Sequence, residues 1–247
     1  MIKKVVIAAA GQGTRMLQLT KDKSKHLIKV NGKPFLSYVL DNLQKAGYDD
    51  FILVVGYESK LMEKFLKDAG YKARVINQFE ILGPKEKIYG TACPLMCVKD
   101  IGEPFLYICG DNFYSVEDLE AMNVDDNFNY VAGFKNDHPE NFGVLLADGD
   151  FLDKIVEKPR LLGGQAKEFV GDLINTSLYK FTPEIFEKVM EIEKSPRGEY
   201  EVTDAVSLLA QEKKVKINKI KDFWMDFGKP EDVEKLSKFL DENNSKR

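Results

Sequence analysis

The segment AAAGQGTRM, residues 8–16, places a glycine-rich loop directly after an apolar run. The run at 5–10 is too short for a helix and is typical of a buried strand. A loop that leaves a parallel strand presents backbone N–H groups to anions, and Arg15 adds a forked donor suited to phosphate oxygens. The Gly-Lys-Ser/Thr ending of a P-loop is absent, and Met16 stands where a dinucleotide-binding loop has its third glycine. The segment predicts a phosphate-binding loop of another type, with a simple strand-to-helix turn as the alternative.

The first half of the chain alternates apolar runs with amphipathic stretches, as α/β domains do. This order predicts a mostly parallel sheet with helices on both faces. Ligands bind such sheets at the carboxyl ends of the strands, where the glycine-rich loop and Asp111 fall. Further strands are expected at 51–55, 74–77 and 105–109, and helices at 34–46, 61–66 and 91–100.

The whole chain, 1–247, is expected to form one continuous domain. Its second half is expected to contain an inserted antiparallel section. Asp148-Gly149-Asp150 is a hairpin signal between two of its strands. The expected strands are 130–134, 143–147, 151–157, 169–181 and 215–220, and the expected helices are 183–193, 202–213 and one after Pro230.

The composition excludes several classes of protein. The 247 residues carry 36 basic and 40 acidic side chains, a net charge of −4, which argues against nucleic acid as the partner. No stretch approaches the roughly 20 apolar residues that span a bilayer, and the N-terminal segment lacks a signal-peptide cleavage pattern. The three cysteines have neither disulfide nor metal-site spacing. A cytoplasmic protein without a membrane partner is expected.

Several short motifs follow the loop in a fixed order. They are KHL at 25–27, GTA at 90–92, GDN at 110–112, FGV at 142–144, EKP at 157–159, NTSLY at 175–179, RGEYEVTD at 197–204 and WMDFGKPED at 224–232. With Gly-x-Gly-Thr-Arg at 11–15, they make the chain resemble the sugar-1-phosphate nucleotidylyltransferases, and KHL is most similar to the short glucose-1-phosphate thymidylyltransferases. The resemblance implies a Rossmann-like nucleotidyltransferase fold with an inserted antiparallel sugar-binding section. In it 1–115 mainly binds nucleotide and 130–228 mainly binds sugar phosphate.

The resemblance also implies a reaction. A nucleoside monophosphate is transferred, with Mg²⁺, from a nucleoside triphosphate to a sugar 1-phosphate, which gives a nucleotide sugar and pyrophosphate. The resemblance favours dTTP, then UTP, and glucose 1-phosphate as the sugar. Because the attacking phosphate oxygen is already an anion, catalysis requires positioning and charge neutralisation rather than a general base. Relatives of this type commonly form homo-oligomers, and the sequence leaves open whether this chain does so.

The site residues carried over from the family fall into four sets. The catalytic set is Arg15, Lys25, Asp111 and Lys158. The nucleotide-binding set is Ala10, Gly11, Gly13, Thr14, Arg15, Lys25, Gly90 and Asp111. The sugar-phosphate set is Gly143, Glu157, Lys158, Asn175 and Arg197. Mg²⁺ is assigned to Asp111 and Asp226.

Some positions depart from the family pattern. The glutamine that usually precedes the glycine equivalent to Gly90 is replaced by Lys85, although Gln78 could reach the base through a loop insertion. Ser177 stands where glycine is common. Glu201 could line the sugar pocket or cap the following helix. Two other functions stay open: cytidylyl transfer to an alcohol phosphate such as phosphocholine, and a non-catalytic nucleotide-sugar sensor.

Overall fold

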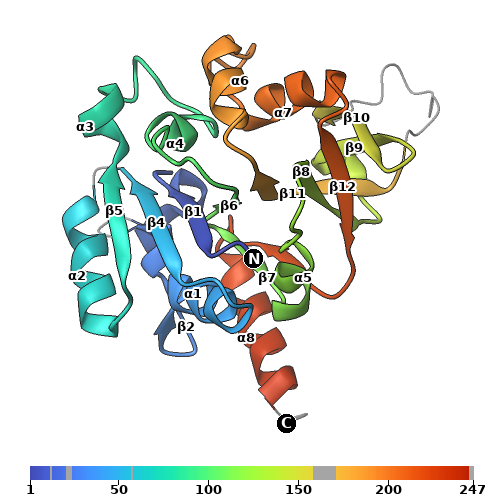
Figure 1. Ribbon diagram of the computed structural model, residues 1–247. Helices are drawn as coiled ribbons and strands as arrows, with labels where there is room; N and C mark the ends of the chain where they lie inside the picture. The colour runs from blue at the N-terminus through green and yellow to red at the C-terminus, as the bar shows by residue number, and fades with distance from the viewer. Residues whose placement is uncertain (12, 21–23, 57, 158–170, 245–247) are drawn as a thin grey trace.

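The computed structural model describes residues 1–247 except 12, 21–23, 57, 158–170 and 245–247. Within the described residues, a nine-stranded mixed sheet is the main feature of the molecule (Figure 1). Its strands lie in the order β5 (Ala73–Asn77), β4 (Asp50–Val55), β1 (Lys4–Ala9), β6 (Phe105–Cys109), β11 (Leu173–Phe181), β8 (Asn129–Lys135), β12 (Val215–Ile220), β10 (Phe151–Glu157) and β9 (Gly143–Asp148). The sheet therefore continues from the first half of the chain into the second through the β6–β11 pair.

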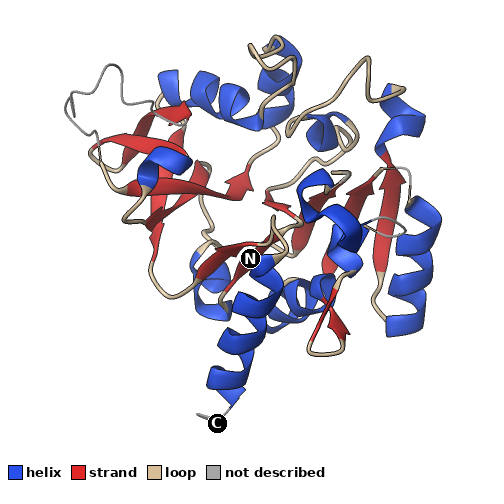
Figure 2. Cartoon of the chain, turned by 180° about the vertical axis from the view of Figure 1, so that it is seen from behind, coloured by secondary structure: helices blue, strands red, loops and turns tan. Residues whose placement is uncertain are grey.

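Helices cover both faces of the sheet, as the sequence predicts (Figure 2). β5, β4, β1 and β6 are parallel, and the side chains of β1 alternate between two cores. Val5 and Ile7 pack into the first core, and Val6 packs into the second. The first core includes residues of α1 (Phe35–Lys45), α2 (Ser59–Ala69), α5 (Val116–Ala121) and α8 (Glu231–Asn244), and the second includes residues of α4 (Cys93–Met96), α6 (Ile185–Glu191) and α7 (Val202–Gln211).

The second half of the sheet is largely antiparallel. β11 pairs antiparallel with both β6 and β8, and β10 pairs antiparallel with both β9 and β12, whereas β8 and β12 are parallel. Phe151 lies opposite Asp148, which leaves Gly149 and Asp150 as the two-residue turn of the predicted hairpin.

Two small sheets flank the main one. β2 (Lys29–Val30) pairs with β3 (Lys33–Pro34), and β7 (Asn112–Tyr114) pairs antiparallel with β13 (Trp224–Asp226). In the second pair Asp226 lies opposite Asn112. A late strand is thereby brought beside the residues that follow β6.

One predicted helix is shorter in the structure, and the short helix after the glycine-rich loop was not among those predicted. The helix expected at 91–100 is reduced to α4, because the backbone N–H of Ala92 donates to the carbonyl of Tyr200 at 2.9 Å and the residues after α4 form tight turns. After the glycine-rich loop the chain forms the 3₁₀ helix η1 (Thr14–Thr20), and Met16 N donates to Gly13 O at 2.8 Å. The remaining short helices are η2 (Lys25–Leu27), α3 (Gln78–Leu82) and η3 (Pro139–Asn141). None of the helices in the described part of the chain has the length and apolar character to cross a membrane.

Candidate active site

The candidate site lies where the chain reverses its direction of travel across the sheet. After β1 the chain builds β4 and β5 on one side and then returns to add β6 on the other side. Ligands bind open α/β sheets at such a switch point, beyond the carboxyl ends of the strands. A cavity of about 220 Å³ is found there. The predicted nucleotide-binding residues that line it are Ala10, Gly11, Arg15, Lys25, Gly90 and Asp111.

The glycine-rich loop packs against Lys25. Gly13 adopts a positive φ of 63°, and a Cβ atom at that position would lie 2.9 Å from the Cβ of Lys25. The Gly13 carbonyl accepts hydrogen bonds from the Met16 backbone and, at 3.2 Å, from the Thr20 hydroxyl. Gly13 therefore permits the loop to close over the lysine, and Thr14 begins the 3₁₀ helix that follows.

A buried ion pair joins Lys25 to Asp111. Lys25 lies on η2 and Asp111 follows β6, so the sheet brings together residues that are distant in sequence. Burial opposes both charges, but each group stabilises the charge of the other, so the pKa of Lys25 is raised and that of Asp111 is lowered. Burial and the Lys25 charge lower the pKa of the neighbouring His26 to about 3, which keeps that ring neutral.

Asp226 lies beside this pair, and its pKa is shifted in the direction opposite to that of Asp111. The backbone N–H of Phe227 donates to the Asp111 carbonyl at 2.8 Å, and the Trp224 indole donates to Asn112 Oδ1 at 2.8 Å. These bonds fix β13 against β7. Burial and the charge of Asp111 raise the pKa of Asp226 to about 6.

The two carboxylates fit a hard divalent cation. A cation would offset the repulsion that raises the pKa of Asp226, and carboxylate oxygens are ligands that Mg²⁺ prefers. In the described ranges no group of three or more His, Cys, Asp or Glu side chains is arranged to hold a metal. Asp111 and Asp226 are the carboxylates at this site that could hold such a cation.

Most of the predicted sugar-side residues form a second group. Gly143 lies opposite Glu157 in the β9–β10 pair, and a Cβ atom on Gly143 would lie 3.0 Å from Glu157 Oε1. The Arg197 guanidinium donates to Glu201 at 2.7 Å and is also within electrostatic range of Glu157. Asn175 lies in the β11 irregularity that precedes Tyr179. Lys158 lies outside the described residues.

Glu201 holds Arg197 rather than capping α7. Its buried carboxylate accepts hydrogen bonds from the Thr91 hydroxyl at 3.1 Å and from Arg197, and it makes no side-chain bond to the helix N-terminus. Thr91 Oγ1 instead accepts the backbone N–H of Val202 at 2.9 Å. The sugar side and the nucleotide cavity are therefore connected through Thr91.

The structure gives a reason for glycine at position 90 that the sequence did not suggest. We expected it to let the nucleobase approach the backbone. Gly90 has a φ of 141°, and a Cβ atom there would collide with the backbone of Tyr200. The glycine is required on that side by another segment of the protein, while Gly90 still lines the cavity.

Gln78 is the most unusual polar side chain of the cavity wall. It is the first residue of α3, only 1% exposed, and neither of its amide atoms has a hydrogen-bond partner within the described structure. Buried amides are almost always paired, so an amide without a partner among the described residues, on a residue of the cavity wall, is a candidate ligand-binding group. Sequence reasoning named Gln78 only as a residue that a loop insertion could bring to the base, because it lies further upstream of Gly90 than the usual glutamine of the family. Tyr89 and Glu199 also line the cavity and were not predicted.

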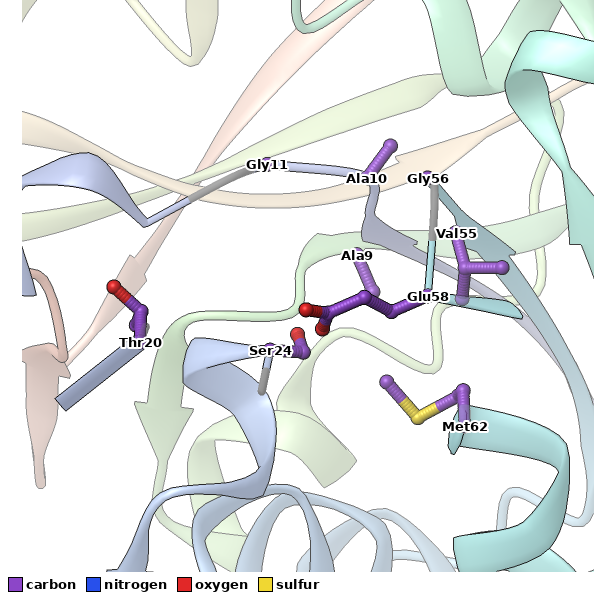
Figure 3. Close-up of a pocket in the computed structure, with 9 residues that line it drawn as sticks. All are labelled: Ala9, Ala10, Gly11, Thr20, Ser24, Val55, Gly56, Glu58 and Met62. Carbon is purple, nitrogen blue, oxygen red and sulfur yellow. The ribbon is translucent and has the colours of Figure 1, made fainter. Parts of the chain in front are cut away.

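A second cavity, of about 290 Å³, lies on the other side of the loop between the ends of β1 and β4. Figure 3 shows the Glu58 side chain extending from its wall toward Ser24 and Thr20. Burial raises the pKa of Glu58, and the lining that the structure describes includes neither lysine nor arginine. A polyanion is therefore better accommodated in the first cavity, where Arg15 and Lys25 lie.

Comparison of the chain with known proteins gives matches over nearly its full length. The bifunctional sugar-1-phosphate nucleotidylyltransferase/acetyltransferase of Sulfurisphaera tokodaii is 31% identical over 97% of this chain and 56% of its own. The bifunctional protein GlmU of Methanocaldococcus jannaschii is 32% identical over 95% and 53%. The chain thus spans about half the length of these relatives. The UTP–glucose-1-phosphate uridylyltransferase AglF of Haloferax volcanii is 31% identical over 98% of both chains.

Solved structures share the fold. A putative glucose-1-phosphate thymidylyltransferase from Bacillus anthracis superposes with a TM-score of 0.77 at 24% identity, over 96% of this chain and 94% of the other. A UDP-glucose pyrophosphorylase with bound UDP-glucose gives 0.81 at 22% identity, over 98% and 100%. The model of the family described as Nucleotidyl transferase matches residues 4–243. The chain therefore belongs to the nucleotidyl transferase family of enzymes.

Proposed function

We propose that the chain transfers a nucleoside monophosphate from UTP or dTTP to a sugar 1-phosphate and releases pyrophosphate. The observation that carries this proposal is the cavity between β1 and β6. It joins a phosphate-type loop, the buried Lys25–Asp111 pair and the Gln78 amide, which has no hydrogen-bond partner among the described residues. A polyanion on the cationic side and a nucleobase on the amide side would satisfy these groups together.

The reaction needs positioning more than proton transfer. An oxygen of the sugar phosphate attacks the α-phosphorus, the bond from that phosphorus to the β-phosphate bridge breaks, and pyrophosphate leaves with the electron pair. Lys25 lies at the cavity floor, where its charge would neutralise the α-phosphate. Arg15 is exposed on η1 directly after the loop, where its guanidinium would face the leaving pyrophosphate.

Asp111 and Asp226 would hold Mg²⁺. When bound, the cation supplies charge neutralisation between the two substrates' phosphates. Burial places both carboxylates where such a charge is most effective, and Lys25 remains as the cation that pairs with Asp111 in the protein alone.

The sugar phosphate would bind across 130–228, while 1–115 would hold the nucleotide. Glu157 and Asn175 are suited to accept or donate hydrogen bonds with sugar hydroxyls. Gly143 leaves the space in which the Glu157 carboxylate lies. Arg197, held by Glu201, would contact the sugar phosphate, and Lys158 would do so from the segment next to Glu157.

The nucleotide is proposed to be UTP, with dTTP second. The uridylyltransferase from Haloferax volcanii supports this order, because it matches this chain along nearly the full length of both. The side-chain amide of Gln78 carries one donor group next to one acceptor group. This arrangement suits the adjacent N–H and carbonyl of a uracil or thymine ring.

A pyrophosphate-release assay tests the proposal. The common nucleoside triphosphates are crossed with a panel of sugar 1-phosphates and phosphocholine, each with and without Mg²⁺. We expect turnover with UTP or dTTP and a hexose 1-phosphate, glucose 1-phosphate first, only when Mg²⁺ is present. Turnover with CTP and phosphocholine alone would replace the proposal by cytidylyl transfer. Nucleotide-sugar binding without turnover of any pair would favour a sensor.

A further inference from the structure

The segment between α3 and Gly90 brings one aromatic side chain into the nucleotide cavity. Residues 83–89 separate the end of α3 from Gly90, and Tyr89 is the last of them. The Tyr89 side chain lines the same cavity as Gln78, Lys25 and Asp111.

Tyr89 is held from two directions. Its carbonyl accepts the backbone N–H of Tyr200 at 2.8 Å, and the next residue, Gly90, packs against the same Tyr200 backbone. The Lys85 ammonium lies 4.7 Å from the centroid of the Tyr89 ring, within cation–π range. The backbone of Tyr89 is therefore fixed against Tyr200, and its ring contacts Lys85 of the preceding segment, which reduces the conformational entropy lost when a ligand packs against the ring.

The charges that act on the Tyr89 phenol show that the ring lies near Lys25 and Glu199. Burial raises the pKa of the Tyr89 phenol, the charge of Glu199 raises it further, and the charge of Lys25 lowers it. A ligand that extends from the Gln78 amide to the Lys25–Asp111 pair shares this one cavity with the ring. The part of a nucleotide that lies between its base edge and its α-phosphate is the face of the base and the ribose.

We infer that the Tyr89 ring is a nucleotide-binding surface, against which the base and ribose of the nucleoside triphosphate pack. The inference rests on the proposed function, and it assigns part of the nucleotide affinity to the segment between α3 and Gly90. Aromatic rings bind bases by stacking, a contact that depends on the ring and not on the hydroxyl. The sugar 1-phosphate, bound by the second half, is not expected to contact Tyr89.

Substitution of Tyr89 tests this inference by titration calorimetry with UTP and Mg²⁺ in the absence of sugar phosphate. Tyr89→Ala should weaken UTP binding about 5- to 150-fold, the range of a lost aromatic–base contact of about 1–3 kcal/mol. Tyr89→Phe should bind UTP as the wild type does. In turnover assays Tyr89→Ala should raise KM for UTP and leave KM for the sugar 1-phosphate unchanged.

Ile81→Ala is the matched control, since Ile81 lies on neighbouring α3, is 55% exposed and is not in the cavity wall. Tyr89→Leu keeps apolar volume without a ring and replaces Tyr89→Ala if that variant does not fold. Unchanged UTP affinity in Tyr89→Leu, or an equal loss in Tyr89→Phe, overturns the inference. A wild-type chain that binds no nucleoside triphosphate fails before any variant is compared, and this outcome identifies the proposed function as the error.

Discussion

Asp226 should limit the stability of the protein while serving its proposed metal site. Burial and the nearby Asp111 charge raise its pKa from 3.8 to about 6, so folding disfavours the ionised carboxylate. Asp226→Asn replaces this group by a neutral side chain of similar shape. We expect the variant to be more stable than the wild type at neutral and alkaline pH without metal, and to lose turnover.

The magnitude and its pH dependence follow from the two pKa values. The stability contributed by a carboxyl whose pKa is raised by folding is fully present below pH 3.8 and is lost as the pH rises through about 6. At 1.36 kcal/mol per pH unit, the full cost of ionising Asp226 is about 3 kcal/mol, an upper value for the gain in Asp226→Asn. Roughly half of this cost is present at pH 5, and nearly all of it at pH 8.

Urea unfolding at pH 5 and pH 8, in EDTA and then in Mg²⁺, measures this effect. In EDTA the advantage of Asp226→Asn should grow from pH 5 to pH 8, and Mg²⁺ should restore stability mainly to the wild type. Asp153→Asn is the matched control, because Asp153 is exposed on β10. An advantage that is absent, or that is equal at both pH values, would refute the assigned electrostatics. Equal stabilisation of both proteins by Mg²⁺ would remove Asp226 from the metal site.

Three further substitutions test separate parts of the account. Asp111→Asn should lower turnover by roughly 10²–10³-fold with an unchanged circular dichroism spectrum, since it weakens the charge-neutralising centre; pyrophosphate release at the wild-type rate would contradict this role. Gln78→Met should add about 1 kcal/mol to the free energy of unfolding, because an unpaired buried amide is removed, and should raise KM for UTP; a lower melting temperature together with an unchanged KM would argue against a base contact. Ser177→Gly should stabilise the fold by about 1 kcal/mol, because Ser177 adopts a φ of 59° that favours glycine; a destabilised variant, measured by thermal unfolding, would show that the serine side chain contributes more than its backbone costs.

Local sequence patterns predicted most elements of the sheet. The apolar run at 51–55 corresponds to β4, and the mixed apolar and polar segment at 215–220 corresponds to β12, because the burial of a strand is reflected in its own side chains. Which strands lie next to each other in the sheet was harder to predict from the sequence. The insertion of β11 between β6 and β8 depends on contacts between distant segments, which no short window contains.

The candidate site likewise combines residues that a local motif predicts with residues that distant segments bring together. Gly13 and Arg15 could be recognised from one loop, but the Lys25–Asp111 pair and the position of Asp226 required the family resemblance. The sheet then supplied a physical reason, since β6 and β13 end beside each other through β7. Gln78 could be named from the sequence only as a residue that a loop insertion could bring to the base. Its burial without a hydrogen-bond partner among the described residues adds a physical reason to treat it as a ligand-binding candidate.

The central claim is that the α-phosphoryl group is transferred to the sugar phosphate. Parallel reactions with α-labelled and γ-labelled UTP, each with glucose 1-phosphate and Mg²⁺, follow the two phosphorus atoms directly. The account predicts that the α label enters the nucleotide sugar and the γ label leaves in pyrophosphate. Transfer of the γ label to the sugar phosphate, or its release as orthophosphate while the α label stays in UDP, would contradict it.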